Sequence, residues 1–215
     1  MYRLQEHQGV DLTKLLTYLI GASVVGSLSF FNLVKKNWFS YCFWNFGLAE
    51  AETVEEISIG LNKTYHAKQV FELEELRADL CVQQDGYVEV YCPKFCDYIY
   101  DFQASGMIMV FCGVMTLIFV MVSVTSAILS YHSQGCCAFN PSPIPFVFYS
   151  LGVGVYFFSV KMRSFEKTAD MAGIPTIDYQ VSHGFVFAGV LVIAHFLVML
   201  YGYFSLKKLF VTNTN

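Results

Sequence analysis

Four long apolar runs set the limits on what this chain can fold into. They lie at residues 15–34, 105–131, 144–161 and 181–206, and each is uncharged between its ends. About 20 apolar residues in a helix cross a hydrocarbon core of about 30 Å. Charged residues make up 14% of the chain, against about 25% in soluble domains. The sequence therefore predicts a membrane α-helical protein, a bundle of four transmembrane helices with both termini on one side.

A polar segment at residues 35–104 separates the first two runs. It contains both tryptophans and four of the seven cysteines, Cys42, Cys81, Cys92 and Cys96. Its twelve carboxylates outnumber its six lysine and arginine side chains. Nucleic acid is excluded as a partner, because its phosphate backbone demands a cationic surface. A basic partner or a cation would suit the segment, and the alternative is an acidic surface that only water covers.

Lysine and arginine leave the orientation in the membrane undecided. They normally gather at cytoplasmic helix ends, but here the predicted loops 35–104 and 162–180 carry more of them than the termini do. Four cysteines in one aqueous segment indicate disulfides and an oxidising compartment. Asn62-Lys63-Thr64 is an acceptor for N-glycosylation, which occurs in the lumen. We therefore expect extracellular loops, cytoplasmic termini and a multi-pass protein of the plasma membrane.

Residues 79–92 have the pattern of a β-hairpin. Valines alternate after an Asp85-Gly86 turn, and such a turn between alternating apolar residues is a strong hairpin signal. Cys81 and Cys92 would face each other across this hairpin if its turn were slightly wider than Asp85-Gly86. Four cysteines allow three pairings, and we predict the pairs Cys81–Cys92 and Cys42–Cys96.

Two neighbouring stretches extend this local prediction. Ile57, Ile59 and Leu61 alternate with other residues and so predict another strand. Residues 70–80 fit either a short amphipathic helix or a strand. We favour a small, disulfide-stapled antiparallel β-sheet in the first extracellular loop.

The order of these features resembles the claudin and peripheral-myelin-protein superfamily, which includes the calcium-channel gamma subunits and the AMPA-receptor regulatory subunits. The matching residues are Trp38 or Trp44 after the first helix, Gly47-Leu48, and Cys81 with Cys92 ahead of the second helix. The resemblance covers nearly the whole chain. It implies one claudin-like tetraspan domain over residues 1–215, with internal termini and an extracellular sheet that carries a tryptophan, a Gly-Leu-Trp stretch and a cysteine pair.

Two features depart from the family pattern. Gly47-Leu48 is followed by Ala49 and lies 33 positions before Cys81, whereas in the family the Gly-Leu-Trp stretch comes just before the first cysteine. The loop also carries two additional cysteines and a glycosylation acceptor, which looks more like the gamma-subunit branch. We expect an auxiliary or scaffolding subunit of a larger channel or receptor complex, bound to other integral membrane proteins. The alternative is claudin-like adhesion or junction-strand formation with copies of itself.

An enzyme would have to be built on the cysteines or the histidines. Cys92 and Cys96 are separated by three residues instead of the two of thioredoxin-like pairs, so a thiol–disulfide oxidoreductase is a distant alternative. His195 lies near the middle of the fourth run, where a polar ring is a functional candidate by default. We expect it to bond a Ser or Tyr of another helix instead. The sequence thus predicts no enzyme, no cofactor and no metal site.

The remaining cysteines lie in or beside the second run. Cys136 and Cys137 follow it on the predicted cytoplasmic side, where adjacent cysteines suit reversible palmitoylation. Unmodified thiols are the alternative. Cys112 lies inside the run and is expected to pack as a small residue.

Two further patterns concern packing at the membrane. Ala22-x-x-x-Gly26 in the first run predicts close helix packing inside the bundle, with dimerisation as the alternative. Aromatic side chains near the predicted membrane surface are expected to anchor the interface. They are Trp38, Phe39, Tyr41, Phe43, Trp44, Tyr98 and Tyr100.

Overall fold

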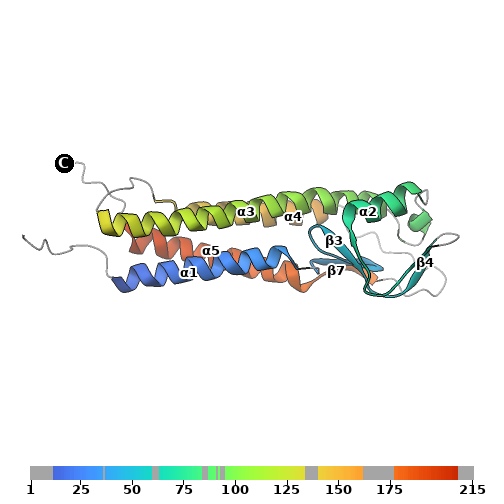
Figure 1. Ribbon diagram of the computed structural model, residues 1–215, viewed down its shortest axis with the longest axis horizontal. Coiled ribbons are helices and arrows are strands. Elements are labelled where there is room, and N and C mark those ends of the chain that lie inside the picture. The colour runs from blue at the N-terminus through green and yellow to red at the C-terminus, as the bar shows by residue number, and fades with distance from the viewer. Residues whose placement is uncertain are drawn as a thin grey trace, which may run out of the picture. The chain divides into compact units, whose positions relative to one another are not determined.

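The computed structural model describes residues 12–35, 37–59, 63–83, 87–90, 92, 95–133, 140–161 and 177–207. Four helices are long and apolar enough to cross a membrane (Figure 1), namely α1 (Leu12–Leu33), α3 (Phe95–Ser133), α4 (Pro143–Lys161) and α5 (His183–Ser205). The predicted four-helix membrane protein is confirmed. α3 begins ten residues before the predicted position 105. The apolar pattern did not predict these ten residues, because the first turns of α3 carry Asp97 and Asp101.

Prolines mark the start of α4. Pro143 is its first residue, a position that tolerates proline because the N–H groups of the first turn have no partner within a helix. The N–H of Ile144 donates to the carbonyl of Pro141 over 3.1 Å. Asn140 Oδ1 accepts from the N–H of Ser142 over 3.0 Å. These contacts close the turn that leads into the helix.

Contacts divide the chain into two compact units, and each of the four long helices contributes to both. The unit that we call the helical unit contains Met1–Phe30, Gly113–Ser150 and Val190–Asn215. The unit that we call the sheet unit contains Phe31–Cys112 and Leu151–Gly189.

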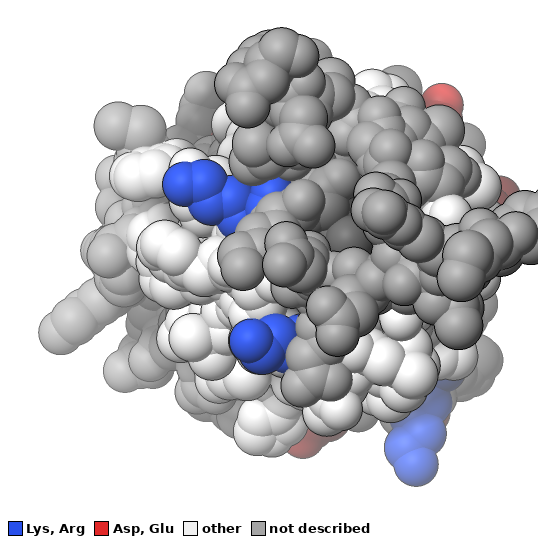
Figure 2. All heavy atoms as spheres, turned by 90° about the vertical axis from the view of Figure 1, so that its left-hand side faces the viewer, with Lys and Arg blue, Asp and Glu red and all other residues white. Residues whose placement is uncertain are grey.

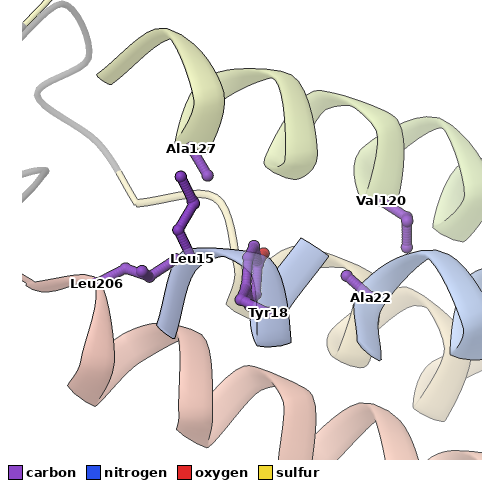
Figure 3. Packing of buried hydrophobic residues seen from close by; sticks show 6 residues of the cluster. All are labelled: Leu15, Tyr18, Ala22, Val120, Ala127 and Leu206. Atoms are coloured by element: carbon purple, nitrogen blue, oxygen red, sulfur yellow. The ribbon is translucent and has the colours of Figure 1, made fainter. Parts of the chain in front are cut away.

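In the helical unit, α1 packs closely against α3. Leu15 extends from α1 toward Ala127, and Ala22 faces Val120 (Figure 3). A Cβ placed on Gly26 would lie 3.1 Å from Val120 Cγ1. The small residues of the predicted Ala22-x-x-x-Gly26 pattern therefore bring α1 close to α3 of the same chain, as expected for packing inside the bundle.

Aromatic contacts connect the other helices of this unit. Phe119 of α3 stacks on Phe148 of α4 at 5.2 Å between ring centroids. Phe146 of α4 lies 5.4 Å from Phe196 of α5. A Cβ on Gly21 of α1 would lie 3.6 Å from Val198 of α5, so the four helices close a ring in the order α1, α3, α4, α5.

The sheet unit contains a five-stranded antiparallel sheet in the order β6, β3, β2, β1, β7. The strands, in chain order, are β1 (Phe39–Cys42), β2 (Trp44–Phe46), β3 (Glu50–Thr53), β6 (Val70–Glu72) and β7 (Ile177–Val181). β7 comes from the second predicted loop and pairs with β1, with Phe39 opposite Val181. The sheet therefore joins both loops. A separate pair is formed by β4 (Ile57–Ile59), which fulfils the predicted strand, and β5 (Lys63–Tyr65).

The predicted hairpin at residues 79–92 is wrong. β6 leads directly into α2 (Leu73–Arg77), a π-helical turn η1 (Ala78–Gln83) follows, and η2 (Tyr87–Val90) is a 3₁₀-helix. Leu73, Leu76 and Leu80 recur at helical spacing and are all buried. Burial of this leucine row outweighs the local hairpin preference of Asp85-Gly86, a turn that lies outside the described residues.

Candidate functional site

One face of the sheet forms an aromatic core with the first turns of α3. Phe46 stacks on Phe102 at 4.7 Å between ring centroids, and Trp44 lies 4.8 Å from Phe95. Side chains alternate across a strand, so every second strand residue faces this core. The buried strand residues on this side are Phe39, Tyr41, Trp44, Phe46, Ala51 and Thr53.

Trp38 links the end of α1, the start of β1 and α4. It is 0% exposed, its Nε1 donates to the carbonyl of Asn32 over 3.2 Å, and its ring meets Tyr156 edge-on at 5.2 Å. Asn32 Nδ2 in turn donates to the carbonyl of Gly184 in α5 over 3.2 Å. Asn32 was recognisable from the sequence, since it is the one amide in the apolar run 15–34.

The predicted role of the loop aromatics as interfacial anchors is wrong for five of them. Trp38, Phe39, Tyr41, Phe43 and Trp44 are all buried inside the sheet unit, so they do not face lipid headgroups. Burial between sheet and helix removes more apolar surface from water than an interfacial position would. Tyr100, by contrast, is exposed.

Gly47 and Leu48 form the turn between β2 and β3. The N–H of Gly47 donates to the carbonyl of Glu50 over 2.7 Å, and the side chain of Leu48 is buried. The backbone of Leu48 lies directly against Gly106 of α3. This dipeptide therefore positions the sheet on the helix, a role that sequence spacing alone did not reveal.

The four loop cysteines form two disulfides, but not in the predicted pairs. Cys42 is bonded to Cys92, with 6.0 Å between the Cα atoms, and Cys81 to Cys96, with 5.7 Å. The predicted pairs Cys81–Cys92 and Cys42–Cys96 are wrong because they were derived from a hairpin that does not form. Cys92 and Cys96, the candidate redox pair, belong to different disulfides.

The opposite face of the sheet is mainly polar, although Val70 of β6, opposite Glu52, is exposed on it. Ser40, Asn45 and Glu52 lie opposite one another on β1, β2 and β3, and Ser40 Oγ donates to Asn45 Oδ1 over 2.6 Å. In the next row Glu50 of β3 lies opposite Glu72 of β6, and both are exposed. This surface, which we call the outer face, therefore presents hydrogen-bonding groups and carboxylates from a hydrogen-bonded scaffold.

A buried tyrosine connects the β4–β5 pair to η1. Tyr65 is buried, and its hydroxyl donates to the Asp79 carboxylate. Burial raises the pKa of Tyr65 above its ordinary value, and the hydrogen bond and negative charge of Asp79 raise the pKa further. The pair therefore holds the phenol protonated and fixes η1 against the strand.

His195 lies in the helical unit and bonds to another helix. It is 3% exposed, and its Nε2 lies 2.9 Å from Ser29 Oγ of α1. Ser29 already donates its hydroxyl proton to the carbonyl of Val25 over 2.9 Å, so its oxygen accepts and His195 Nε2 carries the donated proton. The ring lies 5.0 Å from that of Tyr149. The expected interhelical bond to a serine is confirmed.

Several sequence-predicted modification sites lie outside the described residues. They are the glycosylation acceptor Asn62 and the palmitoylation candidates Cys136 and Cys137. Cys112 is described, and it is buried in α3, where its Cβ would lie 2.7 Å from a Cβ on Gly152 of α4. Within the described part of the chain, no group of three His, Cys, Asp or Glu side chains could hold a metal ion.

Charge is divided unevenly between the two units. Every Asp and Glu that the structure describes lies in the sheet unit, whereas the described charges of the helical unit are Lys14 and Lys207. Figure 2 faces the molecule from the left-hand side of Figure 1 and shows lysine or arginine atoms among uncharged ones, with acidic atoms only at the margin. The outer face thus belongs to the acidic part of the protein.

Comparison of the chain with protein-family models and with curated protein sequences gives no match.

Proposed function

We propose that this chain is a non-enzymatic integral membrane protein that acts as an auxiliary or scaffolding subunit of a larger membrane channel or receptor complex. The observation that carries this proposal is the outer face. Asn45 stands at its centre, flanked by Ser40 and Glu52, on a sheet with a closed aromatic core and two disulfides. A rigid polar surface loses little conformational entropy when a partner binds it.

The charge of the outer face favours a basic partner over a second copy of the chain. Glu50 and Glu72 lie opposite each other and are exposed. Two such faces placed together would bring like charges into contact, which costs several kcal/mol. Adhesion through identical faces, the second function that the sequence suggests, would therefore require bridging cations. A partner with lysine or arginine at its surface requires none.

Two polar side chains of the long helices have structural contacts, which supports a protein without catalytic chemistry. His195 is bonded to Ser29, and Asn32 is bonded to the backbone of α5. Both bonds connect different helices. Such interhelical bonds stabilise helix association in a membrane.

The claudin-like relationship is part of this proposal. Support comes from a sheet that follows the first helix, from Trp38 at the centre of its packing and from Gly47-Leu48 against α3. The disulfides depart from the family pattern, because neither joins Cys81 to Cys92. The departure bears on the sheet unit and leaves the four-helix arrangement unaffected.

We also propose that the five-stranded sheet lies outside the cell and both termini in the cytoplasm of a plasma-membrane protein. Two disulfides suit an oxidising compartment. The helical unit carries lysines and no described carboxylate, which suits the cytoplasmic side. In this orientation Asn62 would be glycosylated, and Cys136 and Cys137 would be available for palmitoylation.

The proposal can be tested by purification in gentle detergent followed by mass spectrometry. The native chain should recover one larger membrane protein at fixed stoichiometry. Glu52→Lys combined with Glu72→Lys should abolish that recovery, because it reverses charge on the outer face. Glu55→Lys is the matched control, since Glu55 is exposed but lies outside the sheet. The double variant and the Glu55→Lys control must reach the cell surface equally. If the double variant still recovers the larger membrane protein, the proposal is rejected.

A further inference from the structure

The two disulfides of the sheet unit have different surroundings. Cys42 and Cys92 are both 0% exposed. Cys81 and Cys96 are half-buried, and Val82, which follows Cys81, is 70% exposed. Thiol–disulfide exchange requires a thiolate to reach one of the two sulfurs. The Cys81–Cys96 bond therefore joins residues that are partly exposed, whereas the Cys42–Cys92 bond joins residues that are fully buried in the native fold.

Other contacts hold the segments that Cys81 and Cys96 connect. Leu76 and Leu80 are 0% exposed, and their burial holds α2 and η1 in place. At the exposed side of these helices the Arg77 guanidinium lies 5.5 Å from the ring centroid of Tyr100, one turn along α3 from Cys96. Opening the disulfide would leave these contacts in place, so the two sulfurs would stay close enough to bond again.

The position of the two cysteines makes their sulfurs unequal. Cys96 is the second residue of the 39-residue helix α3, and a helix N-terminus stabilises a thiolate. Cys81 lies inside η1 and has no such stabilisation. The more stable thiolate is the better leaving group, so attack on Cys81 Sγ with departure of Cys96 is favoured. The Glu89 carboxylate, which accepts the N–H of Cys96 over 3.2 Å, opposes this effect.

We propose that the Cys81–Cys96 disulfide is a thiol-exchange site for low-molecular-weight thiols of the glutathione class, whereas Cys42–Cys92 is a structural disulfide. The external thiolate forms a bond to Cys81 Sγ, the Cys81–Cys96 bond breaks, and Cys96 leaves as the thiolate. A second external thiolate then attacks the glutathione sulfur of the mixed disulfide and releases Cys81. In sum, two thiols are oxidised to one disulfide and the Cys81–Cys96 bond is reduced.

This site shares no residue with the outer face, so a failed test of thiol exchange can be told apart from a failed test of partner binding. The test uses the full native chain in detergent with reduced glutathione. Samples are quenched with acid, their free thiols are alkylated, the remaining disulfides are reduced and alkylated with a heavy reagent, and peptides are measured by mass spectrometry. The first, light reagent reports cysteines that glutathione has reduced. Cys81 and Cys96 should acquire this light label at least about tenfold faster than Cys42 and Cys92, because a buried bond must first be exposed by opening of the fold.

The same samples show which sulfur is attacked. The glutathione adduct should appear on Cys81, and Glu89→Gln should accelerate its formation, because the variant removes a charge that opposes the leaving thiolate. Equal labelling of all four cysteines would overturn the proposal, as would labelling of Cys81 and Cys96 only when tryptophan fluorescence reports unfolding. An adduct confined to Cys96 would overturn the assigned direction of attack.

Discussion

The carbonyl oxygen of Leu48 lies so close to Gly106 of α3 that a Cβ at that glycine would be 2.0 Å from it. Leu48 belongs to the turn between β2 and β3, and Gly106 lies near the start of the apolar part of α3. The approach involves backbone on both sides, so a side-chain rotation cannot relieve a clash there. This one contact fixes where the sheet rests on the helix.

Gly106→Ala should therefore destabilise the sheet unit. The added methyl would force the turn away from α3, and such overpacking costs about 1–3 kcal/mol. The measurement is the midpoint of thermal unfolding followed by tryptophan fluorescence, since both tryptophans lie in the sheet unit. Gly154→Ala in α4 is the control, because a Cβ there meets nothing within 4 Å. It should leave stability unchanged or raise it by up to about 1 kcal/mol. Equal effects of the two variants would contradict the contact.

Loss of the two disulfides should have unequal effects. Cys42–Cys92 closes a separation of 50 residues and Cys81–Cys96 one of 15. Chain entropy then predicts losses of about 4 and about 3 kcal/mol, and burial of the first bond adds to the difference. The variants Cys42→Ser with Cys92→Ser and Cys81→Ser with Cys96→Ser should be compared by denaturant unfolding. If the Cys81→Ser/Cys96→Ser variant loses more free energy of unfolding than the Cys42→Ser/Cys92→Ser variant, the Cys81–Cys96 bond is the more important one for stability.

Ser29 and His195 should prove energetically coupled. Removing either partner breaks the interhelical hydrogen bond between them, so Ser29→Ala, His195→Phe and the double variant form a cycle. Coupling of about 0.5–2 kcal/mol is expected for contacting residues in such a cycle. Ser27→Ala is the matched control, because Ser27 lies on the exposed side of α1. If the effects of the two single variants on stability are additive, the Ser29–His195 hydrogen bond contributes no coupling energy.

The Tyr65–Asp79 pair predicts a loss of stability at alkaline pH. The folded protein holds the phenol proton more tightly than the unfolded chain, since the pKa of Tyr65 is raised. Above the ordinary tyrosine pKa of about 10 the unfolded chain releases this proton, so stability falls as pH rises further. Unfolding midpoints from pH 8 to 11 should show a smaller decline for Tyr65→Phe than for the native chain. Identical profiles would exclude the contribution of Tyr65.

The long helices could be predicted from the sequence, whereas the contacts within the loops could not. Long apolar runs predict membrane helices because the hydrocarbon core imposes one length and one polarity. The start of α3 was missed because Asp97 and Asp101 interrupt the apolar pattern, although they lie on a helix that continues beyond the apolar run. Its first turns are helical because Phe95, Ile99 and Phe102 cover the sheet.

The disulfide pairing could not be predicted from the sequence, because it depends on tertiary contacts. Cys81 lies beside Cys96 only once the leucine row of α2 and η1 is buried against the unit, and this burial depends on residues far away in the chain. The Asp85-Gly86 turn signal is local and carries no such information. The pairing of β7 with β1 and the contact of Leu48 with Gly106 are likewise tertiary, so no spacing within one segment could have indicated them.

Binding of another membrane protein to the outer face can be tested with a photo-cross-linking amino acid in place of Asn45. In cells that display the protein at their surface, Asn45 should cross-link to one larger membrane protein, while the same amino acid at Glu55 should give no such product. If position 45 of a surface-delivered protein gives no cross-link, or only a product with a second copy of the chain, the outer face does not bind such a partner.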